Sequence, residues 1–510
     1  MEGGIIMNFI YLALFVCWFI LVRAEWKKKA KSRGKVLPPG PWKLPIIGNL
    51  LHLSSSSLPP HRALVDLAKR YGSPSGLMHL KLGEISTVVV SSREMAKEFL
   101  RTQDVVFASR AELMATKILL YNRTDFTFSP YGDHWRQMRK ISMMELFNTK
   151  RVRSFSSIRQ DEMHHLLTHI RSSLGRPVNV TKRISLFTSS LTCRSALGRV
   201  FSGREELLEL FEEMFNLLGA FEFADVFPSL KFLHGLCGNK NRLLEVHRKV
   251  DPILDSIIKE HEKNLDSGEL LGGEGESESE DIIHALIKLK RNGGYQLPIT
   301  HDTIKGIILD IFIGATETSS STVVWAMSEM MKNPGVLAKA QAEVRGKEKL
   351  EENDSIVDQL PYLKSVVKET LRCHIPGPFL IPRECREETV VGGYTIPVKA
   401  RVLINAWALA RDPKYWENPD SFIPERFDNN SIDFMGNHFE FLPFGSGRRM
   451  CPGLALGLVN TVAPLAHMLY HFDWNFIPGI TTDTLDMTEM VGIAASKSKD
   501  LFLIPTPVVN

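Results

Sequence analysis

The fold of this 510-residue chain is decided by the stretch Phe444-Gly445-Ser446-Gly447-Arg448-Arg449-Met450-Cys451-Pro452-Gly453. It matches the pattern F-x-x-G-x-R-x-C-x-G at every fixed position, and chance produces such a match in roughly one of 10⁴ chains of this length. Glycines allow the backbone to come close, so amide donors can surround the sulfur of Cys451, while Arg449 presents a planar fork of donors to a carboxylate. The alternative interpretation is a buried free cysteine in a glycine-rich turn.

This loop resembles the haem-thiolate loop of cytochrome P450, and the resemblance implies the fold of that family, which is mainly α with small β-sheets. It implies haem b as the cofactor, with Cys451 as the axial thiolate ligand of the iron, Arg449 at a haem propionate and Phe444 over the proximal side of the ring. A thiolate ligand pushes electron density through the iron and favours cleavage of bound dioxygen. The resemblance therefore implies oxygen-activating chemistry.

Two further motifs resemble the same family in their order along the chain. Glu369 and Arg372 are three residues apart, so they share one face of a helix. Arg426 lies in Pro424-Glu425-Arg426-Phe427, which resembles the segment whose arginine joins that pair. Taken alone, Glu369 and Arg372 would be a solvated ion pair. The resemblance implies a structural network of all three residues that holds the cysteine loop and does no chemistry.

A third motif places an aromatic and a basic side chain together. Trp135 and Arg139 are four residues apart on a predicted helix, so an indole N–H and a guanidinium can point at one anion. The resemblance implies that both are haem propionate ligands and that Arg383 is another, and it makes Arg110 a further candidate. The alternative for the Trp135 and Arg139 pair is a surface cation–π contact.

The longest predicted helix begins at the N-cap Thr300 and ends at Asn333-Pro334. Its polar segment 314–321 resembles the oxygen-binding motif A/G-G-x-D/E-T. The resemblance implies two catalytic residues, Thr318 with its hydroxyl toward dioxygen and Glu317 as a source of protons. The alternative is a patch of hydroxyls bonded back to helix carbonyls. Ala315 replaces the glycine that is usual at the second motif position, and its methyl group predicts a narrower oxygen groove.

The amino-terminal region predicts a membrane anchor. Residues 5–22 are apolar and uncharged, and as a helix they span roughly 27 Å, close to the hydrocarbon thickness of a bilayer. Residues 23–35 are strongly basic, so the positive-inside rule keeps the rest of the chain in the cytosol. A cleaved signal peptide is the alternative, but the run has no basic segment before it. We predict an anchor at 1–22, a basic and proline-rich hinge at 23–49 and a haem-thiolate catalytic domain at 50–510.

The composition is that of a globular protein with balanced charge. A net charge of +4, with 24% charged residues, argues against a nucleic-acid partner. The six cysteines lie far apart without a CxxC pair, so neither a zinc module nor a disulfide framework is predicted. Short strands are predicted at Ile85–Val90 and within 389–396, and a solvated acidic loop at 267–281.

The resemblance extends from the proline hinge to Pro505, and segments 129–136 and 381–387 look most like plant microsomal enzymes of terpenoid and alkaloid specialised metabolism. It implies a single-pass protein of the endoplasmic reticulum membrane whose catalytic domain faces the cytosol. It also implies a monooxygenase that inserts one oxygen atom of O₂ into a lipophilic terpenoid or alkaloid, with NADPH-derived electrons from an NADPH–cytochrome reductase. The pocket is expected from 111–121, 310–318, 379–381 and 490–493.

Two other functions are compatible with the same motifs. The first is a haem-thiolate oxidase, isomerase or dehydratase that gives an atypical product by rearrangement, desaturation or ring formation. Thr318 and the anchor argue against an isomerase or dehydratase that uses neither dioxygen nor a reductase. The second is a catalytically silent haem-binding or scaffold protein, which Ala315 alone supports. Dependence on NADPH and turnover of any substrate separate the three.

Overall fold

The computed structural model describes residues 36–508 apart from 55, 57, 199–203, 220–221, 231–238, 268–279, 349, 351–355, 429 and 493. The predicted anchor and the basic cluster lie outside the described residues, as does most of the predicted acidic loop. Within the described part, His301–Lys332 has the length and hydropathy of a membrane span, and 67% of its apolar window is buried inside the protein. That segment is a helix of the core.

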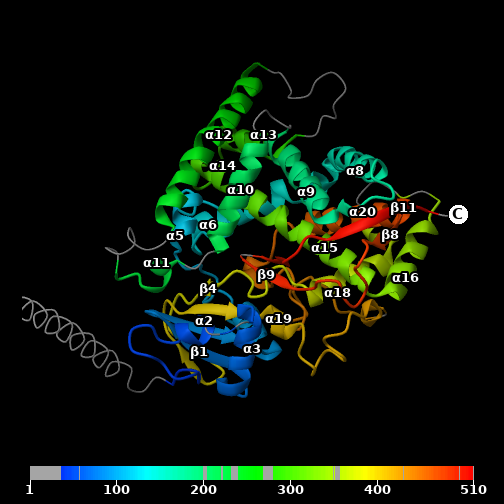
Figure 1. The fold of residues 1–510 in the computed structure, drawn as a ribbon. Helices are drawn as coiled ribbons and strands as arrows, with labels where there is room; N and C mark the ends of the chain where they lie inside the picture. The colour runs from blue at the N-terminus through cyan, green and yellow to red at the C-terminus, as the bar shows by residue number, and fades with distance from the viewer. Residues whose placement is uncertain are drawn as a thin grey trace, which may run out of the picture.

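The chain is mainly helical with small sheets, as predicted, and the sheets lie in different parts of the molecule (Figure 1). The helices are α2 (Leu50–Ser54), α3 (Pro60–Tyr71), α4 (Arg93–Lys97), α5 (Met114–Leu119), α6 (Asp133–Ile141), α7 (Thr149–Ser154), α8 (Ser156–Arg171), α9 (Val180–Leu197), α10 (Arg204–Gly219), α11 (Phe223–Val226), α12 (Lys240–Ser267), α13 (Ile282–Asn292), α14 (His301–Ala315), α15 (Glu317–Lys332), α16 (Pro334–Arg345), α17 (Ile356–Gln359), α18 (Pro361–Cys373), α19 (Ala406–Leu409) and α20 (Leu454–His471). Short π and 3-10 turns are η1 (Glu98–Thr102), η2 (Ser142–Leu146), η4 (Pro424–Phe427) and η5 (Gly447–Arg449).

Small sheets complete the fold within the described residues. Their strands are β1 (Leu77–Leu82), β2 (Ile85–Val90), β3 (Val178–Asn179), β4 (Arg383–Glu384), β5 (Thr389–Val391), β6 (Tyr394–Ile396), β7 (Arg401–Ile404), β8 (Phe472–Phe476), β9 (Glu489–Val491), β10 (Ala495–Lys497) and β11 (Phe502–Pro507). They pair in the orders β1-β2-β7-β4, β3-β11-β8, β5-β6 and β10-β9. The strand predicted at Ile85–Val90 is confirmed. The piece at 389–396 is a hairpin instead of one strand, because Gly392 and Gly393 turn the chain with φ angles of 56° and 82°.

The proline-rich end of the predicted hinge is bound to the largest sheet. The N–H of His79 donates to the carbonyl of Pro39 at 2.8 Å. A Cβ on Gly40 would lie 1.9 Å from the carbonyl oxygen of His79, so this contact requires glycine. Residues 36–49 therefore pack on the body of the protein.

The predicted long helix is divided at Thr316 into α14 and α15. Thr300 caps its start as predicted, since its hydroxyl accepts the N–H of Thr303 at 3.1 Å, and the helix stops before Asn333 as predicted. The predicted extent is confirmed, since His301–Lys332 is helical apart from Thr316, next to which the hydroxyl of Thr318 donates to the carbonyl of Gly314 in the preceding turn. α15 packs against α9, α18 and α20 and so crosses the core (Figure 1).

Candidate active site

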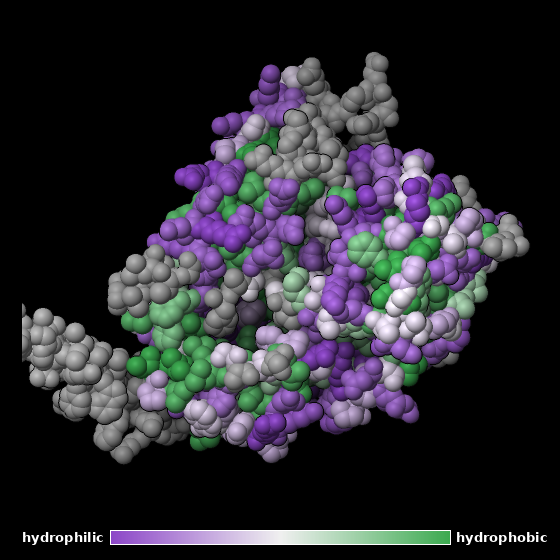
Figure 2. Space-filling model, viewed as in Figure 1, coloured by the Kyte–Doolittle hydropathy of each residue, from purple (hydrophilic) through white to green (hydrophobic). Residues whose placement is uncertain are grey.

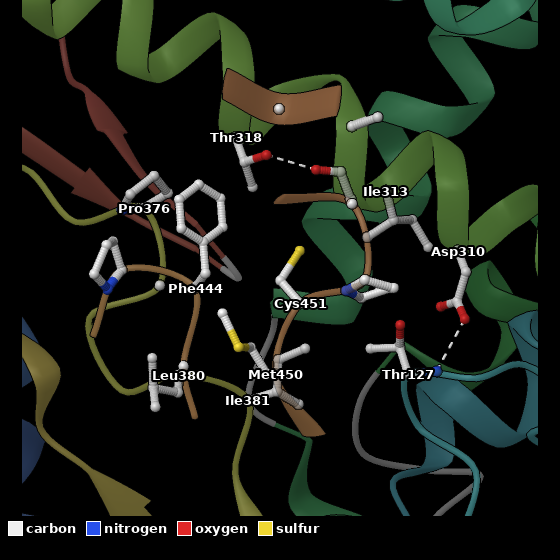
Figure 3. Close-up of a pocket in the computed structure, with 18 of the residues that line it drawn as sticks. Thr127, Asp310, Ile313, Thr318, Pro376, Leu380, Ile381, Phe444, Met450 and Cys451 are labelled. Carbon is white, nitrogen blue, oxygen red and sulfur yellow. Dashed lines mark hydrogen bonds between the residues drawn. The ribbon is translucent and has the colours of Figure 1, made fainter. Parts of the chain in front are cut away.

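A cavity of about 300 Å³ lies between the long helix and the loop that carries Cys451. The Cys451 sulfur points into it, with Phe444 beside it and Thr318 on the opposite wall (Figure 3). Much of the lining is apolar and comes from several elements: Phe126, Phe128, Phe147, Phe215, Ile311, Ile313, Val367, Leu371, Leu380 and Ile381. The cavity is therefore an apolar chamber with a thiol on one wall and a hydroxyl on the other.

Tight turns before α20 build the cysteine loop. Gly445 and Gly447 have φ angles of 72° and 69°. A Cβ on Gly447 would lie 2.1 Å from the carbonyl oxygen of Leu100, so only glycine fits there. The N–H of Cys451 donates to the carbonyl of Phe444 at 2.9 Å and closes the loop. Of the cysteines in the described residues, Cys451 alone has an exposed side chain, and it is exposed to the cavity.

The surroundings of Cys451 suit a metal ligand. Burial raises the pKa of the Cys451 thiol, while the backbone N–H of Gly453 and the guanidinium of Arg139 lower it in part. A cation in the cavity would favour the thiolate, because a metal ion displaces the proton from a coordinating thiol. The position of the sulfur and its partial charge compensation are thus compatible with an iron ligand.

Trp135 and four arginines line one side of the cavity. The arginines are Arg110, Arg139, Arg383 and Arg449. Several of their donors are already bonded to protein atoms. Arg449 donates to the carbonyls of Ala108 at 2.8 Å and Ser129 at 2.6 Å, and the indole N–H of Trp135 donates to the carbonyl of Phe126 at 3.1 Å. The predicted propionate-binding residues are therefore brought together. Backbone carbonyls are the partners of Trp135 and Arg449, and Arg383 bonds the carboxylate of Asp104 at 2.6 Å and the carbonyl of Ser446 at 2.8 Å.

Burial outweighs the neighbouring carboxylates of Asp104, Asp125 and Asp310, so the pKa values of the buried arginines in this group are lowered. Burial, and then the charge of Arg383, lowers the pKa of Arg449 to about 9. Burial, and then the charges of Arg449 and Arg383, lowers the pKa of Arg110. Burial also lowers the pKa of Arg139, which donates no hydrogen bond to any residue that the structure describes. An anionic ligand in the cavity would relieve this concentration of positive charge.

Thr318 and Ala315 both line the opposite wall. The hydroxyl of Thr318 donates to the carbonyl of Gly314 at 2.5 Å, and the hydroxyl of Thr322 donates to the carbonyl of Thr318 at 2.7 Å. The alternative stated for the polar segment, bonding back to helix carbonyls, is thus present in the structure. It coexists with a position on the cavity wall, so the two interpretations do not exclude each other.

Glu317 lies beside this wall and is not among the residues that line the cavity. Burial, followed by the charge of Glu212, raises the pKa of the Glu317 carboxyl. A carboxyl group with a raised pKa keeps its proton closer to neutral pH, which is a property of general acids.

Sequence reasoning placed Asp310 in the expected pocket lining, but it gave no role to Asp310 or to the buried carboxylate of Asp125. Asp310 projects from α14 and accepts the N–H groups of Phe126 at 2.9 Å and Thr127 at 3.0 Å. Asp125 lies in the segment between α5 and α6 and is fully buried. The available signal was a lone carboxylate in the apolar run Leu309-Asp310-Ile311-Phe312, since such a residue is rarely buried unless it is paired.

The predicted structural network is confirmed. Glu369 accepts from Arg372 Nε at 2.7 Å and from Arg426 Nε at 2.9 Å, and Glu369 and Arg372 have no exposed side-chain surface. The solvated ion pair is therefore excluded for these residues. None of the three lines the cavity, in agreement with a structural role.

The predicted pocket segments contribute unequally. Residues 310–318 and 379–381 supply lining side chains. The prediction for 111–121 is wrong for this cavity, because α5 packs against α12 and the Tyr121 hydroxyl donates to Asp251 at 2.9 Å. Within 490–493, Met490 is exposed and Ile493 lies outside the described residues, while the adjacent Ala494 is the residue that lines the wall.

The residues of the cavity fit a flat, doubly anionic metal complex such as haem. A Cβ on Gly314 or on Gly453 would meet no atom within 4 Å, although both glycines line the cavity, so each leaves open space in front of its wall. The thiol supplies a soft metal ligand, and the arginines supply donors for carboxylates. Shape, ligand chemistry and charge agree.

Comparisons with known proteins agree with this arrangement. A sequence profile of the family described as Cytochrome P450 matches residues 38–503. Premnaspirodiene oxygenase from Hyoscyamus muticus is 54% identical over 504 residues, and 5-epiaristolochene 1,3-dihydroxylase from Nicotiana tabacum is 54% identical over 506 residues, each match covering 98% of both chains. A zebrafish cytochrome P450 structure with progesterone superimposes with a TM-score of 0.74 at 24% identity, covering 88% of this chain and 100% of that one, which shows the shared fold.

Proposed function

The chain belongs to the cytochrome P450 family of haem-thiolate monooxygenases, and we propose that it inserts one oxygen atom of O₂ into a lipophilic terpenoid. The observation that carries the proposal is the apolar cavity that separates the Cys451 sulfur from the Thr318 hydroxyl (Figure 3). Two relatives are named as enzymes that oxygenate premnaspirodiene and dihydroxylate 5-epiaristolochene. For that reason we choose a terpenoid over an alkaloid.

Haem b, bound at Cys451, supplies the activation of O₂. Cys451 would hold the iron through its thiolate sulfur, and Phe444, which lies beside it, would pack against the bound group. Trp135, Arg139, Arg383 and Arg449 would bind the propionates. Their charge supports this role, because burial without enough counter-charge lowers the pKa of Arg449 to about 9, and an anion restores it.

Glu317 supplies protons and Thr318 directs them at the cavity wall opposite Cys451. Glu317 retains its proton to a higher pH than an ordinary carboxyl because burial raises its pKa. The Thr318 hydroxyl, held by the Gly314 carbonyl at 2.5 Å, fixes where a proton enters the cavity. Apolar side chains such as Phe128, Phe215 and Ile313 exclude water and hold the substrate by packing.

The proposed enzyme is a single-pass protein of the endoplasmic reticulum membrane. Residues 1–22 anchor it, 23–49 connect it, and 50–510 form the cytosolic catalytic domain, which receives NADPH-derived electrons from an NADPH–cytochrome reductase. The apolar side chains of Trp42, Ile46 and Leu51 are exposed, which supports the proposal that this part of the protein lies close to a membrane. Figure 2 shows apolar surface gathered around α2, where this segment joins the body.

A second candidate is an atypical oxidase, isomerase or dehydratase reaction at the same site. The observation in its favour is Ala315, whose methyl group stands on the cavity wall beside Thr318. A narrower groove there changes where oxygen and substrate meet. The product would then arise by rearrangement, desaturation or ring formation.

The test uses microsomes that contain this chain and an NADPH–cytochrome reductase, with premnaspirodiene or 5-epiaristolochene under ¹⁸O₂. We expect NADPH-dependent product with one labelled oxygen for each oxidation. Unlabelled product would favour the atypical reaction, and no product from any terpenoid would contradict the proposed substrate class. Cys451→Ala should abolish product and the thiolate-type Soret band of the reduced carbon monoxide complex. Cys385→Ala, at a buried cysteine outside the cavity, should keep both.

The membrane proposal has its own test. Deletion of residues 1–22 should move much of the protein from the membrane pellet to the supernatant and leave the Soret band unchanged. Loss of haem from the truncated protein would contradict the proposed separation of anchor and catalytic domain.

A further inference from the structure

Asp125 and Asp310 form a buried pair of carboxyl groups beside the cavity. Their residues are 0% and 4% exposed. Asp310 accepts two backbone N–H groups, and one oxygen of Asp125 accepts the N–H of Phe128. The other oxygen, Asp125 Oδ2, is buried and has no hydrogen-bond partner among the described residues. Asp310 interacts with Asp125, and the charges of Arg110 and Arg449 also act on it.

A buried carboxylate oxygen without a donor is costly, and two facing carboxylates repel each other. One proton removes both penalties, because a carboxyl O–H on one side chain can donate to the free oxygen of the other. We infer that Asp125 and Asp310 share one proton. This singly ionised pair is a positioning element that connects the proposed propionate-binding arginines to the cavity wall that carries Thr318. The inference rests on the proposed haem position.

The electrostatics of both groups agree with the sharing. Burial raises the pKa of Asp125. Burial, and then the charge of Asp125, raises the pKa of Asp310 well above its ordinary range, although backbone N–H groups act in the opposite direction. The charged groups that face the pair from neighbouring elements are Arg110 and Arg449.

The pair can position the arginines because it holds the segment to which they are bonded. Asp310 fixes the N–H groups of Phe126 and Thr127, and the carbonyls of the same residues accept from Trp135, Arg110 and Arg449. Asp310 is on α14, and Thr318 follows eight residues later in the first turn of α15. One proton-dependent contact therefore links the propionate side of the cavity to its oxygen side.

The test compares Asp310→Asn, Asp125→Asn and Asp310→Ala in the haem-loaded protein. An Asn at 310 accepts the same N–H groups through its carbonyl oxygen and donates its amide to Asp125 Oδ2, so it imitates the protonated carboxyl. The readouts are the thermal unfolding midpoint and the ratio of Soret to protein absorbance from pH 6 to pH 9.

The sign of the pH effect follows from linkage. A carboxyl whose pKa is raised by folding contributes stability that is present below its ordinary pKa and is lost as the pH rises through its folded value. The wild-type midpoint and Soret ratio should therefore fall toward pH 9. Each Asn variant should remove that slope and remain within about 3 °C of wild type at pH 6. Asp310→Ala should unfold lower at every pH and lose haem.

Two outcomes overturn the inference. If either Asn variant keeps the wild-type slope, the pair is not the group that titrates. If either Asn variant unfolds as low as Asp310→Ala, both carboxyls are ionised and paired with the arginines. Failure of the proposed haem site is distinguished by wild-type protein that shows no thiolate-type Soret band at any pH.

Discussion

Two buried groups of charged side chains in this protein differ in how their positive charge is compensated. Glu369 meets Arg372 and Arg426 at 2.7 and 2.9 Å, and its hydrogen bond to Arg372 raises the pKa of that guanidinium against the effect of burial. At the cavity, burial and a neighbouring arginine lower the pKa of Arg449 to about 9. A cation paired within the protein is structural, and a cation left short of negative charge is available to a ligand.

The largest effect should come from breaking the network of Glu369, Arg372 and Arg426, which we call the self-paired group because its charges are paired within the protein. Glu369→Ala leaves two guanidiniums without their carboxylate in a buried site, and it should lower the free energy of unfolding by about 3–5 kcal/mol. Denaturant unfolding with and without haem measures it, and both states should lose stability. Lys339→Ala, which breaks the exposed pair with Glu425, should cost less than about 1 kcal/mol. A loss of stability confined to the haem-loaded protein would contradict the assignment of Glu369 to a purely structural network.

Glu489 tests whether a third cluster belongs to the self-paired class. It lies 3.1 Å from His61 and 3.0 Å from Arg62. Burial alone would raise the pKa of Glu489, but the neighbouring His61 and the charge of Arg62 lower it to about 2. Because the folded pKa is depressed, stability should be complete above the ordinary pKa and fall as the pH drops from about 4.5 to 2, by an amount on the order of 2 kcal/mol. Glu489→Gln should flatten this acid limb in unfolding curves, and an unchanged limb would exclude Glu489 as its cause.

Arg139 tests the opposite class, since it donates no hydrogen bond within the described residues. Arg139→Gln should leave the unfolding of haem-free protein unchanged or raise its midpoint, because it removes a buried charge. It should speed haem loss about tenfold, as expected for one charge-assisted hydrogen bond. Transfer of haem to an excess of apomyoglobin measures the rate. Arg136→Gln, on the same helix but more than half exposed, should match wild type. Equal effects of both variants would show that Arg139 does not bind the ligand.

The smallest effect is expected at the cavity wall that carries Thr318 and Ala315. The Thr318 hydroxyl is hydrogen-bonded within the protein and also lines the cavity, so it combines a property of the internally paired groups with one of the groups available to a ligand. Thr318→Ala should lower product per NADPH several-fold, with the missing electrons found as peroxide, an effect on the order of 1 kcal/mol. Ala315→Gly should keep or raise coupling. A changed product or lower coupling in Ala315→Gly would favour the atypical reaction, and no change in either variant would remove this wall from the oxygen site.

The sequence alone determined those features whose geometry is local. The cysteine loop was predictable because its turns need glycine at fixed positions, as Gly447 shows with a carbonyl 2.1 Å from its virtual Cβ. Glu369 and Arg372 were predictable because three residues on a helix bring side chains onto one face. Thr300 was recognised as a cap for the same reason, since the bond to Thr303 spans one turn.

Only the tertiary structure decided which distant groups meet. Asp310 and Phe126 are 184 positions apart, and no spacing rule joins them. The same holds for Arg383 with Asp104, and for 111–121, which the fold turns away from the cavity and toward α12. The physical reason is that helix and turn geometry act over a few residues, whereas the dielectric surroundings and partners of a buried charge depend on every element packed around it.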